Sequence, residues 1–210
     1  MAGDIFDQTV ASYRDERGAA GFVAKEMRNS ENRNASCYAL LETLDLQGRR
    51  VLDIGCGFGR DVAEFRRRGA DAYGCDVSPP LLAQAVREVG PYFSEYDLRS
   101  DEALPFGDGF DVVWACAVLV HVPRMELRTF VKKIHTGLVI GGIAVLISKQ
   151  GEGEEVSRNL GKDLPRVMVF YRAEEVAAAW QALGGTVERA MPDLSVTTYG
   201  DAMFGVVLRK

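Results

Sequence analysis

The 210-residue sequence predicts an α/β fold built on a parallel sheet. From about residue 50 onward, short apolar runs alternate with amphipathic stretches at the spacing of strands and helices. The run Asp111–Val120 is almost continuously apolar, as expected for a strand that is buried on both faces. A glycine turn joins the first strand of this alternation to its first helix. The length suits a single sizeable core, and no repeat or linker divides the chain.

The first elements have recognisable ends. Val51–Ile54 is expected to be a short buried strand, and the helix after it, Arg60–Arg68, should end at Gly69 because glycine favours the C-terminal cap. A second strand is expected over Ala70–Cys75. The next helix should run from the cap residue Ser78, with proline in its first turn, through residue 89.

The later elements continue the same alternation. Tyr92–Tyr96 is a weak third strand and Asp111–Val120 a strong fourth. The stretch Pro123–Leu138 is expected to be a helix, because its apolar residues fall on one stripe. The remaining expected elements are the strand Gly141–Ser148, the helix Ala173–Leu183 and two closing strands, Thr186–Arg189 and Ala202–Leu208.

Two regions lie outside the alternation. Residues 1–46 form a charged, mostly helical leader, which we expect to be a cap or lid rather than an independent domain. Residues 149–172 form a polar, glycine-containing connection after the fifth strand. Long connections at the carboxyl end of a sheet tend to be lids or substrate walls.

The composition excludes several classes of protein. A hydrophobic fraction of 47% and a charged fraction of 26% are ordinary for a soluble domain. The net charge of −5 offers no electrostatic footprint for nucleic acid or an anionic membrane. The longest apolar run, Gly137–Ile147, is too short to span a bilayer, and the N-terminus lacks a signal peptide. We therefore expect a cytoplasmic protein, a monomer or homodimer.

Four widely spaced cysteines agree with a reducing compartment. They form no CxxC pair, no histidine stands at zinc-site spacing, and no acidic cluster suits a divalent metal. We therefore expect no metal. The four thiols are interpreted as small buried hydrophobes at Cys37, Cys56, Cys75 and Cys116.

The glycine turn carries the first functional signal. Gly55, Gly57 and Gly59 would let the backbone turn sharply and let a ligand approach closely. In a dinucleotide-binding fingerprint the third glycine would stand at residue 60, which is arginine here. Asp53, two residues before the turn, suits a ligand that carries an ammonium group. Both features disfavour a nicotinamide-dependent dehydrogenase.

Four motifs in order then resemble one family. VLDIGCGFGRD at Val51–Asp61 resembles motif I of the class I S-adenosylmethionine-dependent methyltransferases, and LPFGDGFDVVWACAVLVHV at Leu104–Val122 is similar to the fourth-strand block of their small-molecule members. GCDVSP at Gly74–Pro79 resembles the end of their second strand, and YDL at Tyr96–Leu98 their adenine-site motif. The resemblance implies a Rossmann-like methyltransferase domain over residues 47–210. It would be a three-layer α/β sandwich with a seven-stranded, mostly parallel sheet and an antiparallel last strand.

The resemblance also implies a cofactor site for S-adenosylmethionine. Asp76 would accept hydrogen bonds from the ribose hydroxyls, and Asp53 would hold the methionyl ammonium directly or through water. Asp97 would accept from the adenine amino group, although Asp101 is a rival for this role. Asp53 and Asp76 could instead merely cap helices. The other implied cofactor-binding residues are Tyr13, Gly55, Cys56, Gly57, Val77, Leu98 and Cys116.

The acceptor side is less specific. His121 is expected to end the fourth strand, where it would line the substrate pocket, serve as a base, or hold the following loop. Tyr171 and Arg172 resemble a segment that walls the substrate site in some relatives. The other histidine, His135, fits a packing or surface position on a helix.

The leading hypothesis is therefore methyl transfer to an oxygen or nitrogen of a small molecule, for example a secondary metabolite. Two alternatives keep the cofactor site: a protein or tRNA methyltransferase, and a non-catalytic protein that binds S-adenosylmethionine.

Overall fold

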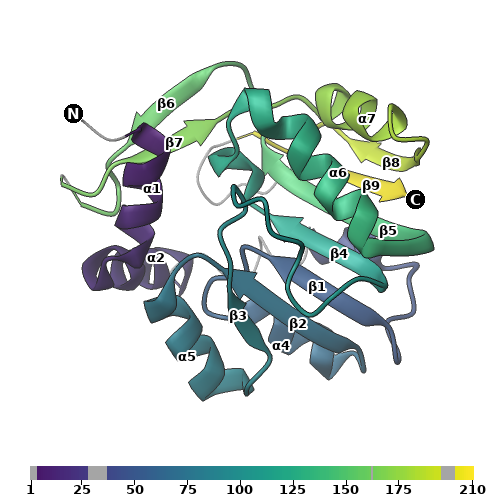
Figure 1. Cartoon of the computed structure of the whole chain (residues 1–210), viewed down its shortest axis with the longest axis horizontal. Helices are drawn as coiled ribbons and strands as arrows, with labels where there is room; N and C mark the ends of the chain where they lie inside the picture. The colour runs from purple at the N-terminus through teal and green to yellow at the C-terminus, as the bar shows by residue number, and fades with distance from the viewer. Residues whose placement is uncertain (1–3, 28–36, 162, 195–201) are drawn as a thin grey trace.

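The computed structural model describes residues 4–27, 37–161, 163–194 and 202–210. Its centre is a seven-stranded sheet of order β3-β2-β1-β4-β5-β9-β8 (Figure 1). Strands β1 to β5 pair in parallel, and β9 pairs antiparallel with both β5 and β8. The predicted three-layer α/β sandwich with an antiparallel last strand is confirmed. Within the described ranges, no helix is long and apolar enough to cross a membrane.

The elements lie close to their predicted positions. The strands of the main sheet are β1 Arg50–Ile54, β2 Asp71–Asp76, β3 Phe93–Glu95, β4 Phe110–Cys116, β5 Leu138–Lys149, β8 Thr186–Met191 and β9 Met203–Arg209. The helices are α1 Ile5–Arg14, α2 Glu16–Met27, α4 Arg60–Arg67, α5 Pro79–Val89, α6 Leu127–Gly137 and α7 Ala173–Gln181. Three short 3-10 turns are η1 Ala39–Leu41, η2 Leu119–His121 and η3 Arg124–Glu126.

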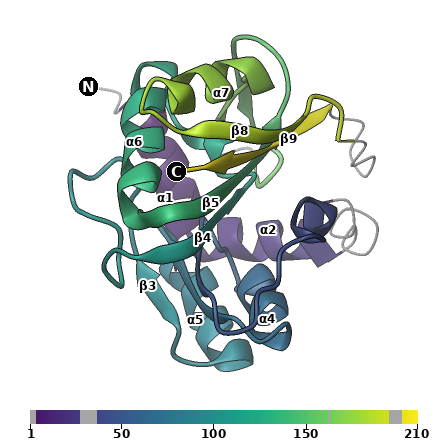
Figure 2. The same cartoon turned by 90° about the vertical axis from the view of Figure 1, so that its right-hand side faces the viewer.

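Apolar side chains on the two faces of the sheet form two cores. In β1, Val51 belongs to one core and Leu52 to the other, as alternating side chains of a strand require. Helices α6 and α7 contribute to the core on the Leu52 face, while α4 contributes to the core on the Val51 face. Figure 2 shows α6 and α4 on opposite sides of the strands.

The fourth strand is shorter than predicted. β4 ends at Cys116, because Ala117 adopts a left-handed conformation with φ of 59° and the chain then forms η2. His121 therefore ends a 3-10 turn beyond the strand, not the strand itself. Leu119 and Val120 remain buried, so the apolar run continues past the strand end and hides the boundary.

The boundaries of the next helix and strand also differ from the prediction by a few residues. The predicted helix Pro123–Leu138 is a 3-10 turn followed by α6, which begins at Leu127. Leu138 has an extended backbone with ψ of 149° and starts β5, three residues before the predicted strand.

The connection after β5 contains a hairpin that the sequence pattern did not predict. Strands β6 (Glu154–Ser157) and β7 (Arg166–Val169) pair antiparallel, separate from the main sheet. Helix α1 lies beside this hairpin (Figure 1). Thr9 Oγ1 accepts a hydrogen bond from the amide of Val167 at 2.9 Å, and Ser12 Oγ donates to the carbonyl of Pro165 at 2.8 Å. These bonds fix the leader over the carboxyl edge of the sheet.

The described part of the leader contains the helices α1 and α2 and the 3-10 turn η1, and residues 42–46 form a turn and irregular chain. Residues 1–3 and 28–36 of the predicted cap at 1–46 lie outside the described residues.

Candidate active site

A cavity lies at the carboxyl ends of β1, β2 and β4 and extends to the N-terminal helices. Its empty space is about 1070 Å³, with the open solvent at its mouth included. Ligands of open α/β sheets bind at this edge. The predicted site residues that line it are Tyr13, Gly55, Cys56, Gly57, Asp76, Val77, Asp97, Leu98, Cys116 and His121.

The glycine turn forms one wall of this cavity. Gly55 and Gly57 have φ angles of 73° and 55°, in the left-handed region that favours glycine. A Cβ atom on Gly55 would stand 2.6 Å from a methyl of Val118, and one on Gly57 would stand 3.3 Å from the ring of Phe22. The turn therefore needs glycine for its conformation and for the close approach of neighbouring side chains.

Asp76 is the last residue of β2 and faces this turn. Its Oδ2 accepts a hydrogen bond from the amide of Gly57, and its Oδ1 accepts one from the amide of Ser78, both at 2.9 Å. Burial raises the pKa of Asp76, and these backbone amides oppose that shift. The side chain that caps α5 is Ser78, not Asp76. Because a carboxylate offers about four acceptor positions, Asp76 keeps capacity for a ligand.

Asp53 lies behind the cavity wall. It is 2% exposed, is not a lining residue, and its Oδ2 has no hydrogen-bond partner among the described residues. Burial and the nearby carboxylate of Asp61 raise the pKa of Asp53 well above its ordinary value, while Arg60 opposes the shift. An orphaned, buried carboxylate oxygen fits a cationic ligand group that approaches through water, one of the two predicted modes.

A further buried carboxylate, which the sequence analysis did not single out, is Asp61 at the start of α4. It accepts hydrogen bonds from Tyr38 Oη at 2.6 Å, Trp114 Nε1 at 3.0 Å and Arg60 Nε at 2.8 Å. Burial alone would raise the pKa of Asp61, but Arg60 and these donors outweigh it and lower the pKa. Arg60 also reaches Glu26 of α2 at 3.3 Å. This end of the cavity thus carries more carboxylates than cations.

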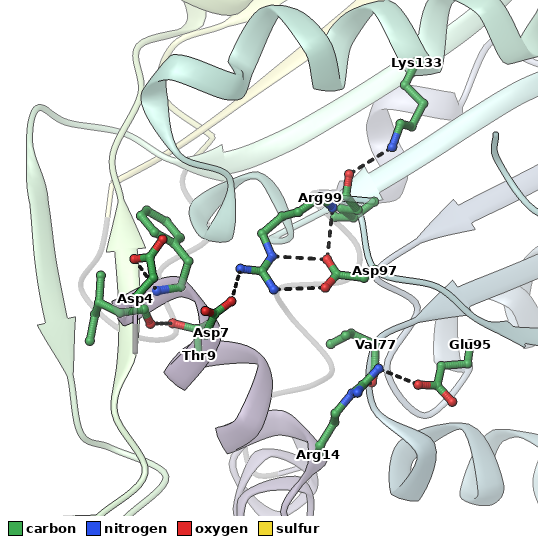
Figure 3. A network of polar contacts seen from close by, with 12 residues as sticks. Asp4, Asp7, Thr9, Arg14, Val77, Glu95, Asp97, Arg99 and Lys133 are labelled. Carbon is green, nitrogen blue, oxygen red and sulfur yellow. Dashed lines mark hydrogen bonds and ion pairs between the residues drawn. The ribbon is translucent and has the colours of Figure 1, made fainter. Parts of the chain in front are cut away.

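Asp97 is held by an arginine that the sequence pattern did not reveal. Arg99 Nε lies 3.2 Å from Asp97 Oδ1 and Nη2 lies 3.0 Å from Oδ2, and Nη1 reaches Asp7 of α1 at 2.9 Å. Figure 3 shows Arg99 between these two carboxylates. Burial would raise the pKa of Asp97, but Arg99 outweighs it and lowers the pKa. The rival residue Asp101 does not line the cavity.

A second arginine fastens α1 nearby. Arg14 Nη2 lies 2.6 Å from Glu95 Oε1 of β3, and Arg14 Nε donates to the carbonyl of Val77 at 3.2 Å (Figure 3). Arg14 and Arg99 therefore connect the leader to the loops that follow β2 and β3.

Tyr13 and His121 meet at the other end of the cavity. Tyr13 Oη lies 2.9 Å from His121 Nε2, and His121 Nδ1 lies 2.8 Å from the carbonyl oxygen of Val167. Because a carbonyl oxygen only accepts, Nδ1 carries the proton and Nε2 accepts from Tyr13. Burial, assisted by the positive charge of Arg166, lowers the pKa of His121 to about 3. The imidazole is therefore neutral near pH 7.

The position of Tyr13 is fixed from several sides. Its carbonyl accepts a hydrogen bond from Ser78 Oγ at 2.5 Å, and its ring packs edge-to-face on Phe22 at 5.9 Å between centroids. Arg166 of β7 donates to its hydroxyl. Burial raises the pKa of Tyr13, against the opposing charge of Arg166, so the phenol is protonated.

Tyr171 and Arg172 are not at the cavity, although the resemblance placed them on the substrate wall. Tyr171 is 1% exposed, packs in the core, and donates its hydroxyl to the carbonyl of Val122 at 2.9 Å. Arg172 is exposed, pairs with Glu152 and caps α7. The same connection instead contacts the lining residue Tyr13 through Arg166, which does not itself line the cavity.

His135 packs on Trp180 at 5.0 Å between ring centroids, as its predicted packing position implies. In the part of the chain that the structure describes, no group of three or more His, Cys, Asp or Glu side chains could hold a metal ion.

Comparison with known proteins shows what the chain is similar to. Residues 51–142 match the model of the methyltransferase domain family. An uncharacterized methyltransferase of Synechocystis sp. is 30% identical over 145 residues, which are 68% of this chain and 65% of the relative. A tRNA U34 carboxymethyltransferase of Alcanivorax borkumensis is 30% identical over 161 residues, which are 73% of this chain and 49% of the relative. The chain thus spans about half to two thirds of these relatives.

Solved structures share the fold. A complex of DhpI with SAM and HEP has a TM-score of 0.80 at 17% identity, with full coverage of both chains. The 1,6-didemethyltoxoflavin-N1-methyltransferase of Burkholderia thailandensis, with bound 1,6-didemethyltoxoflavin and S-adenosylhomocysteine, has a TM-score of 0.70 at 20% identity and covers 95% of this chain and 88% of its own. The chain is thus similar to methyltransferases in residues 51–142, and it shares its fold with structures that bind S-adenosylmethionine or S-adenosylhomocysteine.

Proposed function

We propose that this chain transfers a methyl group from S-adenosylmethionine to an oxygen or nitrogen nucleophile of a small molecule, for example a secondary metabolite. One observation carries the proposal: a single cavity joins the glycine turn and Asp76 to the Tyr13–His121 pair. A nucleoside ligand at the first end would direct its reactive group toward the second.

The chain's own residues would bind the cofactor by charge and hydrogen bonding. Asp76 would accept from the ribose hydroxyls with the acceptor positions that Gly57 and Ser78 leave unused. Asp97 would accept from the adenine amino group beside Leu98. The orphaned Oδ2 of Asp53 would face the methionyl ammonium through water. The excess of carboxylates at this end complements a cofactor that carries a positive sulfonium and ammonium.

When bound, S-adenosylmethionine supplies an electrophilic methyl group, and the protein's task is to align the nucleophile and exclude water. Helices α1 and α2 contribute Tyr13 and Phe22 to the cavity wall and so cover the site. His121 is neutral, so its Nε2 could take a proton from an acceptor hydroxyl once Tyr13 no longer donates to that atom. A free amine would need less help.

A macromolecular acceptor is the alternative, because one relative acts as a tRNA U34 carboxymethyltransferase. The net charge of −5 supports a small acceptor over tRNA, since nucleic-acid binding relies on basic surface. None of the four cysteines, all of which lie in the described ranges, forms a disulfide bond, which supports the proposed cytoplasmic location. Metal independence and a monomeric or homodimeric state stay predictions.

A thermal-shift experiment tests the proposed cofactor. S-adenosylhomocysteine is expected to raise the melting temperature by mass action, whereas NADH is not. A rise with NADH alone, or with neither compound, would refute the proposal. Transfer of a labelled methyl group from S-adenosylmethionine to a panel of small phenols, acids and amines, compared with transfer to bulk tRNA, then distinguishes the two acceptor classes.

A further inference from the structure

We infer that the methyl acceptor carries an anionic group, a carboxylate or a phosphate-type group, which Arg166 binds beside Tyr13 and His121. The inference rests on the proposed function and names the class of its substrate.

Arg166 is a buried cation without a counter-ion among the residues that the structure describes. It is 3% exposed, and its Nη1 and Nη2 donate to two neutral oxygens, those of Tyr13 and Asn159. Its Nε is buried and has no hydrogen-bond partner among the described residues. No described carboxylate forms an ion pair with this guanidinium. Because burial of an unpaired charge is costly, a buried arginine normally has an acid beside it.

Arg60, at the opposite end of the same cavity, shows the usual arrangement. Its guanidinium lies 2.8 Å from Asp61 and 3.3 Å from Glu26. The cavity-lining Arg60 is thus paired with two acids, whereas Arg166, which contacts the lining residue Tyr13 but does not itself line the cavity, is paired with no described acid. A ligand that brings its own negative charge would remove this difference.

The surroundings of Arg166 favour an anion as well. The positive charges of Arg166, Lys149 and Lys25 all act on His121 and disfavour its protonated form. The acids that act on Tyr13, which are Asp76 and Glu26, belong to the cofactor end. Tyr13 therefore lies between the acids near the glycine turn and the cations near His121.

The geometry shows how an anion would be received. Arg166 is 3% exposed and is not a lining residue of the cavity, but it donates to the hydroxyl of Tyr13, which is one. An anionic oxygen placed at this pair would accept from both Tyr13 and Arg166. Tyr13 would then cease to donate to His121, whose Nε2 lone pair becomes available to the acceptor. Binding of the anionic group would therefore at the same time free His121 Nε2 to act as a base.

In the transfer step, the bonds that form and break and the proton that moves can each be assigned. For a hydroxyl acceptor, the oxygen's electron pair forms the bond to the methyl carbon, and the methyl–sulfur bond breaks with its electron pair left on sulfur. The hydroxyl proton goes to Nε2 of His121, and the acceptor's anionic group lies near the imidazolium that results.

Titration of the protein loaded with S-adenosylhomocysteine tests the inference. Inorganic phosphate and acetate are titrated separately by calorimetry, at an ionic strength held constant with sodium chloride. Wild type and the matched surface variant Arg128→Gln, on the exposed side of α6, are expected to bind one of the two anions. Arg166→Gln is expected to bind it about 10- to 100-fold more weakly, because a charge-assisted hydrogen bond is lost. Arg166→Lys, which keeps the charge, should retain part of the affinity.

The outcomes separate the two proposals. If S-adenosylhomocysteine itself does not bind, the proposed function fails. If it binds but neither anion binds wild type beyond the chloride control, the acceptor inference is overturned. Equal anion affinity of Arg166→Gln and wild type also overturns it. Should Arg166→Gln not fold, Arg166→Lys takes its place, with a weaker affinity for the anion expected and an unchanged one contradicting the inference.

Discussion

The two ends of the cavity are built in different ways. The cofactor end is made by residues at the ends of neighbouring strands, such as Asp76 after β2 and the glycine turn after β1, and its buried charges are mainly acidic. The acceptor end brings together α1, η2 and β7 through Tyr13, His121 and Arg166, and its charges are mainly basic. Local strand-to-helix geometry fixes the first end, whereas contacts between distant segments fix the second.

This difference explains where specificity can vary. The backbone of Val167 donates to Thr9 of α1 and accepts from His121, so the hairpin and the leader together set the acceptor end. Substitutions in these two segments would change which acceptor the cavity binds, without disturbing the turn that receives the cofactor.

The largest expected effect comes from the glycine turn. Gly55→Ala should lower the free energy of unfolding by about 2–5 kcal/mol, because the positive φ costs about 1–2 and the clash with Val118 about 1–3. Gly107 has a similar φ of 78°, and a Cβ atom added there would meet no other atom within 4 Å. Gly107→Ala should therefore lower the free energy of unfolding only by the part that comes from the positive φ. Urea unfolding of both variants measures the difference. Equal losses would show that the close approach at Gly55 has no cost.

The second-largest effect is the pH dependence of stability that His121 contributes. The pKa of His121 is about 3 in the folded protein, below its ordinary value of 6.5, so the unfolded chain binds more protons between these values. Stability should fall as pH drops below about 6.5, by at most about 1.4 kcal/mol per pH unit from this group. His121→Gln should remove that part of the slope. Denaturant unfolding of both proteins at several pH values checks this, and parallel curves would refute the neutral, buried imidazole.

The smallest effects concern the arginines that fasten α1. Arg99 holds both oxygens of Asp97 as well as Asp7, so Arg99→Gln should cost about 1–2 kcal/mol of stability. Arg14 and Glu95 are half-exposed, so Arg14→Gln should cost less than about 1 kcal/mol. Thermal unfolding in low and high salt compares them. A larger loss for Arg14→Gln would reverse the ranking of these two contacts.

Most residues that the sequence analysis assigned to the cofactor line one cavity, because the signals that pointed to them are local. The glycines, Asp76 and Asp97 stand at fixed offsets from apolar strands, and the parallel sheet brings strand ends to one edge. The apolar run Asp111–Val120 misled at one point, since buried residues of η2 continue the pattern of β4.

The acceptor end could not be predicted in the same way. Tyr13 and Arg166 are 153 residues apart in the chain, and no spacing rule brings them together. One signal was present: residues 165–170 (PRVMVF) form a short apolar run with alternating valines, and an arginine inside such a run indicates a buried charge. Tyr171 and Arg172 follow directly, but β7 ends before them and directs them to the core and the surface.

The acidic end of the cavity should bind the cofactor independently of the end that carries Tyr13 and His121. Calorimetric titration of S-adenosylhomocysteine into wild type, Asp76→Asn and His121→Gln measures this. We expect a Kd about 10- to 100-fold higher for Asp76→Asn, because a hydrogen bond to a charged group is weakened, and a wild-type Kd for His121→Gln. An unchanged Kd for Asp76→Asn, or an equal loss in both variants, would contradict the division of the cavity into two ends.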